Sequence, residues 1–302
     1  MNQVTATGLR LRLLVSGRRY SAAHYVSRGV LYGTLTFLSV IFLIPLFWMV
    51  TSALKPQPQL FVWPPVWIPT PPQWQNFGEA LTLFPFGMYI ANTLYISIPA
   101  VAGTVLSSSF TAYGFSRIDW PGRDKVFTIV LSTLMLPFAV TMIPLYLVWR
   151  NIGLIGIETP LRGFGPLILP MFLGGGAFNI FLCRQFFMTI PQELSEAARM
   201  DGCSELRIYW QIILPLARPV LATISLFTFL GTWNDFLGPL IYLNSIEQFT
   251  VSIGLRQFQF EHGGRYDYMM AASTLTTLPI IALFFFAQRT FIQGITLTGI
   301  KA

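Results

Sequence analysis

The sequence predicts an all-α fold, a polytopic transmembrane bundle of six helices. Only 10% of the 302 residues are charged, 54% are hydrophobic and the mean hydropathy is +0.60. So few polar side chains cannot cover a soluble globule of this size. Long runs without charge recur along the chain, and they are apolar all round. These runs argue against the two alternatives, a large soluble helical protein and a membrane β-barrel.

Six intervals between charged residues are each long enough for a spanning helix, which needs roughly 20 apolar residues. The fifth interval is interrupted only by Asp235. In chain order the intervals are Arg28 to Lys55, Glu79 to Arg117, Lys125 to Arg150, Arg162 to Arg184, Arg218 to Glu247 and Asp267 to Arg289.

The chain divides into a basic tail, residues 1–28, and one membrane domain, residues 29–302. The first span, 29–54, is far longer than the apolar stretch of a signal peptide, so we expect it to be retained. Proline and tryptophan are interleaved over residues 55–75, which predicts an external loop lying along the membrane surface, either as a plain interfacial loop or as a contact for a partner.

Later spans contain features that favour close packing or breaks. Small residues fill the stretch from Ala100 to Tyr113, which predicts a closely packed inner helix. Pro137 and Pro144 in the third span, and the glycines at 174–176 in the fourth, predict kinks or local unwinding.

The charge distribution predicts cytoplasmic N- and C-termini. With that orientation, 14 of the 19 lysine and arginine side chains fall in the inner segments 1–28, 115–125, 184–218 and 289–302. Positive charge is retained on the cytoplasmic side during insertion. The membrane therefore explains the net charge of +7, and we expect no nucleic acid partner.

Residues 190–215, between the fourth and fifth spans, read as a short surface helix, a sharp turn and a second helix. Thr189 is a candidate cap for the first helix, with Pro191 in its first turn, and Gly202 suits a left-handed helix ending. Ser204 is a candidate cap for the second helix, which Pro215 interrupts. An exposed rigid helical turn suits docking into a cleft on another protein.

This segment resembles the EAA loop of binding-protein-dependent ABC importers, and we refer to residues 190–215 as the EAA loop. Cys203 stands where alanine is usual, and the aromatic position is tyrosine rather than the commoner phenylalanine. Nine positions fall in register with the family pattern: Glu196, Ala197, Ala198, Asp201, Gly202, Tyr209, Ile212, Leu214 and Pro215.

The resemblance covers almost the whole chain and is greatest to the carbohydrate branch, the six-span permeases of the maltose type. It rests also on the segments Trp63-Pro64-Pro65, Trp67-Ile68-Pro69, Asn92-Thr93-Leu94, Arg184-Gln185-Phe186-Phe187, Trp233-Asn234-Asp235-Phe236 and Gly299-Ile300-Lys301. It implies a type I importer permease in a bacterial or archaeal plasma (inner) membrane. The implied partners are a homologous permease, two ATP-binding cassette subunits, an extracytoplasmic sugar-binding protein and a small saccharide.

We expect this chain to be a non-catalytic subunit without a cofactor. A phosphate-binding loop needs lysine followed by Ser or Thr, whereas Lys55, Lys125 and Lys301 precede Pro, Val and Ala. ATP and Mg²⁺ are therefore expected on a partner subunit. No metal site is predicted, because His24 and His262 are far apart in the sequence and on opposite sides of the predicted membrane.

The candidate substrate pathway is Trp233, Asn234, Asp235 and Phe236. A carboxylate within a span is costly unless it is paired or hydrated, so Asp235 must face protein or water. One reading is that Trp233 stacks on a sugar while Asn234 and Asp235 bind hydroxyl groups. The other is that they cap an unwound turn before Gly238. The outer segment 244–267 is, by the resemblance, the loop that reaches the binding protein.

Three other functions stay as alternatives. An ABC importer permease for a non-sugar solute would share the EAA loop. An ion-coupled secondary carrier would show inverted repeats and charged relays within the membrane. An intramembrane enzyme would need converging catalytic side chains or metal ligands inside the spans, which the sequence does not suggest.

Overall fold

The computed structural model describes residues 22–156, 158, 160–260 and 264–298, and this part of the chain contains helices and no β-strand. The longer helices are α2 (Ala22–Ala53), α3 (Gln75–Leu83), α4 (Phe86–Ser116), α5 (Arg123–Ser132), α6 (Phe138–Asn151), α8 (Ala177–Thr189), α9 (Glu193–Met200), α12 (Arg218–Trp233), α14 (Val251–Phe260) and α15 (Tyr266–Thr298). The shorter turns are η1 (Gln57–Gln59), η2 (Thr133–Met135), η3 (Pro160–Gly163), α7 (Gly165–Ile168), η4 (Leu169–Phe172), α10 (Glu205–Ile208), η5 (Tyr209–Ile213), α11 (Leu214–Leu216), α13 (Leu237–Tyr242) and η6 (Ile246–Gln248).

The chain forms two compact units, Met1–Thr51 and Ser52–Ala302, and each is considered by itself. The described part of the first unit is the helix α2. Its side chains are apolar all round, and Phe42 is 77% exposed. An exposed helix of this kind needs lipid or another protein around it. It confirms the first predicted helix, while most of the basic tail lies outside the described residues.

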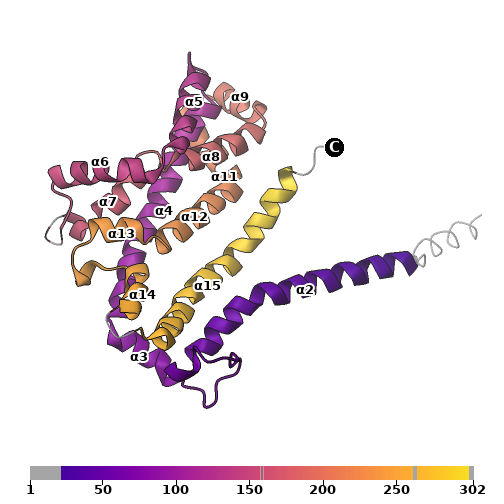
Figure 1. Ribbon diagram of the computed structural model, residues 1–302. Helices are drawn as coiled ribbons and strands as arrows, with labels where there is room; N and C mark the ends of the chain where they lie inside the picture. The colour runs from indigo at the N-terminus through magenta and orange to yellow at the C-terminus, as the bar shows by residue number, and fades with distance from the viewer. Residues whose placement is uncertain (1–21, 157, 159, 261–263, 299–302) are drawn as a thin grey trace, which may run out of the picture. The chain divides into compact units, whose positions relative to one another are not determined.

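Helix α4 runs through the length of the second unit, with α8 and α12 packed along it (Figure 1). Its small residues permit this packing, as predicted. The aromatic ring of Phe172 lies so close to Gly103 that a Cβ there would be 2.5 Å from it. Gly175 lies against the backbone of Thr104 in the same way, at 2.9 Å. Helix α4 is therefore the inner helix of the bundle.

Three predicted spans are broken. The third bends by 99° between η2 and α6, next to Pro137. In the fourth, Gly174, Gly175 and Gly176 all have positive φ (103°, 63° and 91°) and separate η4 from α8. These breaks confirm the kinks predicted at Pro137 and at the glycines, whose φ values only glycine adopts without strain, whereas α6 continues through Pro144. The fifth is interrupted after Trp233, and a 79° bend before Arg218 separates it from Glu205–Leu216 at the end of the EAA loop.

Within the described residues, four stretches are long and apolar enough to cross a membrane: Tyr25–Ala53, Phe86–Ser116, Gly165–Thr189, which includes the glycine break, and Tyr266–Gln288. The number rises to six if each of the two bent pairs, Arg123–Met135 with Phe138–Asn151 and Glu205–Leu216 with Arg218–Trp233, is one span. The helical membrane fold is thus confirmed, and the count of six stays a prediction.

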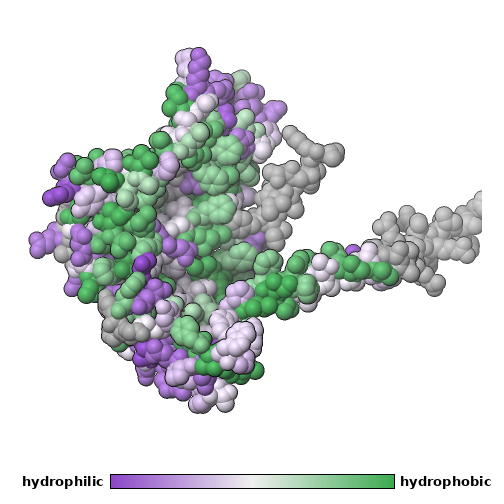
Figure 2. Space-filling model, viewed as in Figure 1, coloured by the Kyte–Doolittle hydropathy of each residue, from purple (hydrophilic) through white to green (hydrophobic). Residues whose placement is uncertain are grey.

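Buried side chains form three clusters along α4. One surrounds its C-terminal end, with α5, α8 and the helices of the EAA loop. Another surrounds its N-terminal end, with α3, α14 and α15. The third lies between α7, α13 and the middle of α4. Figure 2 shows hydrophilic residues around α5 and α9 at one end and around α3 at the other, with hydrophobic surface between them.

Candidate functional site

The EAA loop folds as the predicted helix, turn and helix. Helix α9 ends at Met200, and Gly202 has a φ of 76°, the left-handed ending that its position predicts. The amide of Cys203 donates to the carbonyl of Ala198 at 2.9 Å, which closes the turn. The direction of the chain at this turn is therefore fixed by backbone hydrogen bonds.

The two predicted caps differ in outcome. Ser204 caps α10, because its Oγ accepts a hydrogen bond from the amide of Arg207 at 3.4 Å. The capping role predicted for Thr189 was wrong. Thr189 is the last residue of α8, and its hydroxyl donates back to the carbonyl of Phe186 at 2.7 Å. Helix α8, which is longer, extends through Thr189, and α9 begins after Gln192 instead.

Helix α9 has one buried face and one open face. Ser195 and Ala198 are buried, and Ala198 belongs to the apolar cluster around the end of α4. Ala197 is exposed on the opposite side, between Leu194 (43% exposed) and Met200 (88% exposed). An exposed apolar stripe on a short, well-anchored helix is a surface suited to a protein partner.

The nine positions of the family pattern divide between these faces. The structure places Glu196, Ala197, Asp201, Gly202 and Pro215 on the surface. Ile212 and Leu214 are half-buried, and Ala198 and Tyr209 are buried. Part of the pattern therefore anchors the loop, and only the remainder is available for contact.

Arg117, just after α4, holds the start of the EAA loop. Its side chain is only 4% exposed. Its Nη2 donates to the carbonyls of Phe187 and Ile190 at 2.5 and 2.6 Å. These are carbonyls at the end of α8, where the helix dipole also favours a cation. Arg117 thereby fixes the α8 end to α4.

A second connection joins α4 to both helices of the loop. The Tyr113 hydroxyl donates to Glu205 Oε2 at 2.6 Å, and Arg199 Nε donates to Glu205 Oε1 at 2.7 Å. The hydrogen bond with Glu205 raises the pKa of Arg199 above its usual range, so the guanidinium stays charged. In addition, the hydroxyls of Ser109 and Tyr209 lie 2.8 Å apart. The loop is thus held to α4 at several points.

The sequence reading missed Arg117, Tyr113 and Glu205 as parts of the site. In the sequence, Arg117 stands out only as one positive charge of an inner segment. Nothing in the local sequence around it indicates that it contacts residues 70 and 73 positions away. Only the position of an arginine directly after a long apolar helix could have suggested a buried role.

The second candidate region is the break between α12 and α13, where the four proposed pathway residues lie. Trp233 is only 3% exposed and stacks on Phe229, with the ring centroids 5.3 Å apart. Asp235 Oδ1 accepts a hydrogen bond from the amide of Gly238 at 3.1 Å. This bond confirms the capping reading for Asp235. Burial of the indole leaves little of Trp233 for stacking on a sugar.

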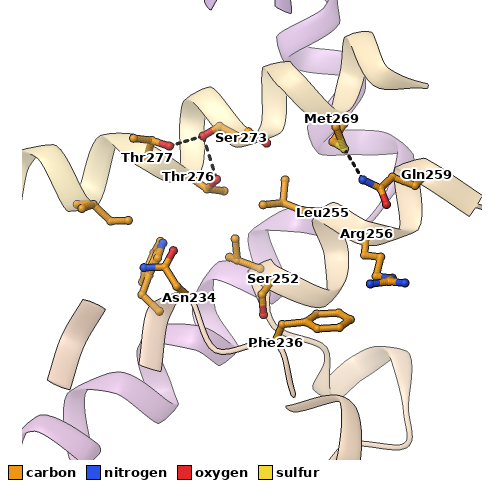
Figure 3. A pocket seen from close by; sticks show the side chains of 13 residues that line it. Asn234, Phe236, Ser252, Leu255, Arg256, Gln259, Met269, Ser273, Thr276 and Thr277 are labelled. Atoms are coloured by element: carbon orange, nitrogen blue, oxygen red, sulfur yellow. Dashed lines mark hydrogen bonds between the residues drawn. The ribbon is translucent and has the colours of Figure 1, made fainter. Parts of the chain in front are cut away.

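The four pathway residues at the helix break do not all line the same cavity. Trp233, Asn234 and Phe236 line a cavity of about 400 Å³ with α14 and α15 (Figure 3). Asp235 lines a different cavity, of about 640 Å³, against the glycine break before α8. Asn179, Thr228 and Thr232 share that second cavity with it. The capped carboxylate therefore still faces open space.

The described residues define a class, a helical membrane protein with broken spans, cavities beside one of the breaks and a helical segment tied by hydrogen bonds to the end of α4. Residues 103–297 match the family described as binding-protein-dependent transport system inner membrane component. The chain belongs to this family, as the resemblance of the EAA loop indicated.

Three comparisons illustrate the family. The chain is 33% identical to the arabinooligosaccharides transport system permease protein AraQ of Bacillus subtilis, over 94% of this chain and 99% of that protein. It is 32% identical to the sn-glycerol-3-phosphate transport system permease protein UgpE of Yersinia enterocolitica, over 85% and 91%. A chain in the crystal structure of a bacterial ABC transporter involved in the import of the acidic polysaccharide alginate superposes with a TM-score of 0.74. That match is 25% identical and covers 90% of this chain and 99% of that one.

Proposed function

We propose that this chain is the permease subunit of an ATP-driven, binding-protein-dependent carbohydrate importer in a plasma (inner) membrane. It forms the translocation pathway together with a homologous permease. The observation that carries the proposal is the anchored EAA loop in a chain that belongs to this family. The carbohydrate assignment is supported by the AraQ relative and by the alginate importer.

The EAA loop is the proposed docking site for an ATP-binding cassette subunit, two of which would serve the heterodimer. ATP and Mg²⁺ are bound there, since this chain has no lysine in a phosphate-binding loop. The exposed positions Glu196, Ala197, Asp201, Gly202 and Pro215 make the contact. The half-buried Ile212 and Leu214, with the buried Ala198 and Tyr209, anchor the loop.

Movement of the docked loop reaches the pathway through α4. Arg117 and the Tyr113–Glu205–Arg199 connection link the loop to this helix through hydrogen bonds of 2.5 to 2.7 Å. Because α8 and α12 pack along α4, a rigid displacement of the loop would reorient all three helices. The loop therefore moves as a rigid body together with α4, rather than bending independently of it.

The orientation follows from the charges, with both termini and the EAA loop in the cytoplasm. The segment 244–267, which contains α14, then lies outside and is proposed to meet the sugar-binding protein. Asp235, Asn179 and Thr232 line the proposed saccharide path, where carboxylate, amide and hydroxyl groups suit sugar hydroxyls. Trp233, Asn234 and Phe236 line its neighbour.

The test is ATPase stimulation in the reconstituted importer. Glu196→Lys reverses a charge on the exposed face of α9, and we expect ATPase activity to lose its dependence on the loaded binding protein. Lys125→Glu reverses an exposed charge on α5, outside the EAA loop, and serves as the matched control. Full stimulation with Glu196→Lys, or equal loss with both variants, would contradict the proposed docking face.

A non-sugar solute is the second candidate, because the chain is 32% identical to a permease named for sn-glycerol-3-phosphate transport. Uptake of a labelled panel that includes neutral oligosaccharides and glycerol phosphate distinguishes the two. Saturable uptake of glycerol phosphate alone would favour the second candidate.

A further inference from the structure

The cavity bounded by the end of α12, by α14 and by α15 carries a positive charge that the proposed transport of sugars does not explain. It has a volume of about 400 Å³, within the range of small-molecule sites. Of the described residues that line it, Arg256 in α14 is the one with a charged side chain. Among the described residues that line it there is no carboxylate.

Arg256 is held in place by aromatic rings rather than by a carboxylate. Its guanidinium lies over the ring of Phe236, 5.1 Å from the centroid, and over that of Phe260, at 5.2 Å. Within the described part of the chain it forms no ion pair, whereas Arg265 is paired with Asp267 at 2.8 Å. A guanidinium supported by rings keeps its N–H donors for an incoming anion.

The rest of the lining is polar and suits the hydroxyl groups of a sugar. Figure 3 shows Asn234 and Ser252 on one side of the cavity and Ser273, Thr276 and Thr277 on the other. Thr276 and Thr277 donate their hydroxyl protons to the carbonyl of Ser273 at 3.1 and 2.7 Å, so their oxygens can accept. Asn234 Nδ2 donates to Leu230, which leaves its side-chain oxygen as an acceptor.

The carboxylate of the helix break, that of Asp235, borders the other cavity. Asp235 does not line this cavity, and its Oδ1 is engaged by the amide of Gly238 at 3.1 Å. The two adjacent residues Asn234 and Asp235 thus separate a cationic cavity from one that contains a carboxylate. A solute with an anionic group has one favourable place in this region, beside Arg256.

We propose that this cavity is a subsite for the anionic group, carboxylate or phosphate, of a saccharide, with Arg256 as its bidentate anchor. Guanidinium pairs with both groups through two parallel N–H donors. The inference rests on the proposed function and narrows its substrate class to acidic or phosphorylated sugars. The probes used in the experiment distinguish a preference for a carboxylate from a preference for a phosphate.

The experiment measures equilibrium binding of three probes to the native importer complex in nanodiscs, without its binding protein. The probes are galactose, galacturonate and galactose 1-phosphate, which share a ring and differ in charge. We expect one or both anionic probes to bind at least about tenfold more tightly than galactose. Arg256→Gln should remove that preference, weakening anion binding about 10- to 100-fold, and Arg256→Lys should retain part of it.

Arg150→Gln is the matched control, since Arg150 is exposed at the end of α6 and does not line the cavity. The melting temperature of each complex excludes a folding defect. Preference for galacturonate alone or for the phosphate alone identifies the anion. Equal binding of the three probes, or anion binding that survives Arg256→Gln, overturns the subsite. Either result leaves the proposed importer function standing, because that function is tested separately through Glu196→Lys.

Discussion

The EAA loop and the helix break at Trp233–Phe236 both interrupt an apolar bundle with polar residues, but they are built in opposite ways. The loop is tied to α4 by hydrogen bonds from Arg117 and Tyr113. The break instead borders cavities of about 400 and 640 Å³. The difference fits the roles proposed for the two regions, because an element that transmits a displacement has to be stiff, whereas a region that admits a solute needs space around its polar groups.

Removing the Arg117 clamp should produce the largest effect. Arg117→Met removes the side-chain donor of two carbonyls, those of Phe187 and Ile190, and the carbonyl of Phe187 keeps only the amide of Ile190, at 3.2 Å. We expect a loss on the order of 3 kcal/mol in stability, together with loss of ATPase stimulation. Thermal unfolding and ATPase assays on the purified complex measure both. A stable complex with normal stimulation would show that the loop is not held in this way.

The second largest effect is expected where α4 packs closely against the glycine break at residues 174–176. A Cβ at Gly175 would lie 2.9 Å from the Thr104 backbone, and its φ of +63° is unfavourable for alanine. We expect Gly175→Ala to cost about 1–3 kcal/mol. Gly114→Ala is the matched control, because nothing lies within 4 Å of its added Cβ. Similar melting temperatures for the two variants would argue against tight packing at the break.

Substitutions at Asp235 distinguish its capping role from its proposed binding role, because the two roles predict different effects on stability and on uptake. Asp235→Asn keeps an oxygen for the amide of Gly238 and removes the charge. If the carboxylate contacts the sugar, KM for uptake should rise about tenfold, an effect of the size expected for a charged hydrogen bond, with the melting temperature unchanged. Asp235→Ala should lower the melting temperature as well. Normal uptake by Asp235→Asn would leave only the capping role.

The smallest effect is expected at the cap of α10. Ser204→Ala removes the acceptor for the amide of Arg207 and should cost about 1 kcal/mol. Faster hydrogen exchange of residues 205–208 would report the loosened turn. Exchange that stays at the wild-type rate would mean that the tertiary contacts of Glu205 and Tyr209 alone hold the turn.

Local signals in the sequence predicted a good part of this structure. Gly202, Ser204 and the glycines at 174–176 act within a few residues of themselves, so their turns and breaks were predictable. Thr189 was misassigned because a longer helix competed for it. The contacts of Arg117 and Tyr113 could not be predicted, since they depend on packing between distant helices. The separation of Asn234 from Asp235 likewise depends on which helices surround the break.

The most direct test of the account is the accessibility of Met200, which is 88% exposed on the proposed docking face. Met200→Cys in a background without Cys183 and Cys203 would be labelled with a membrane-impermeant maleimide. The account predicts labelling only from the cytoplasmic side, and protection when the ATPase subunits are assembled. Labelling from the outer side, or equal labelling with and without those subunits, would contradict it.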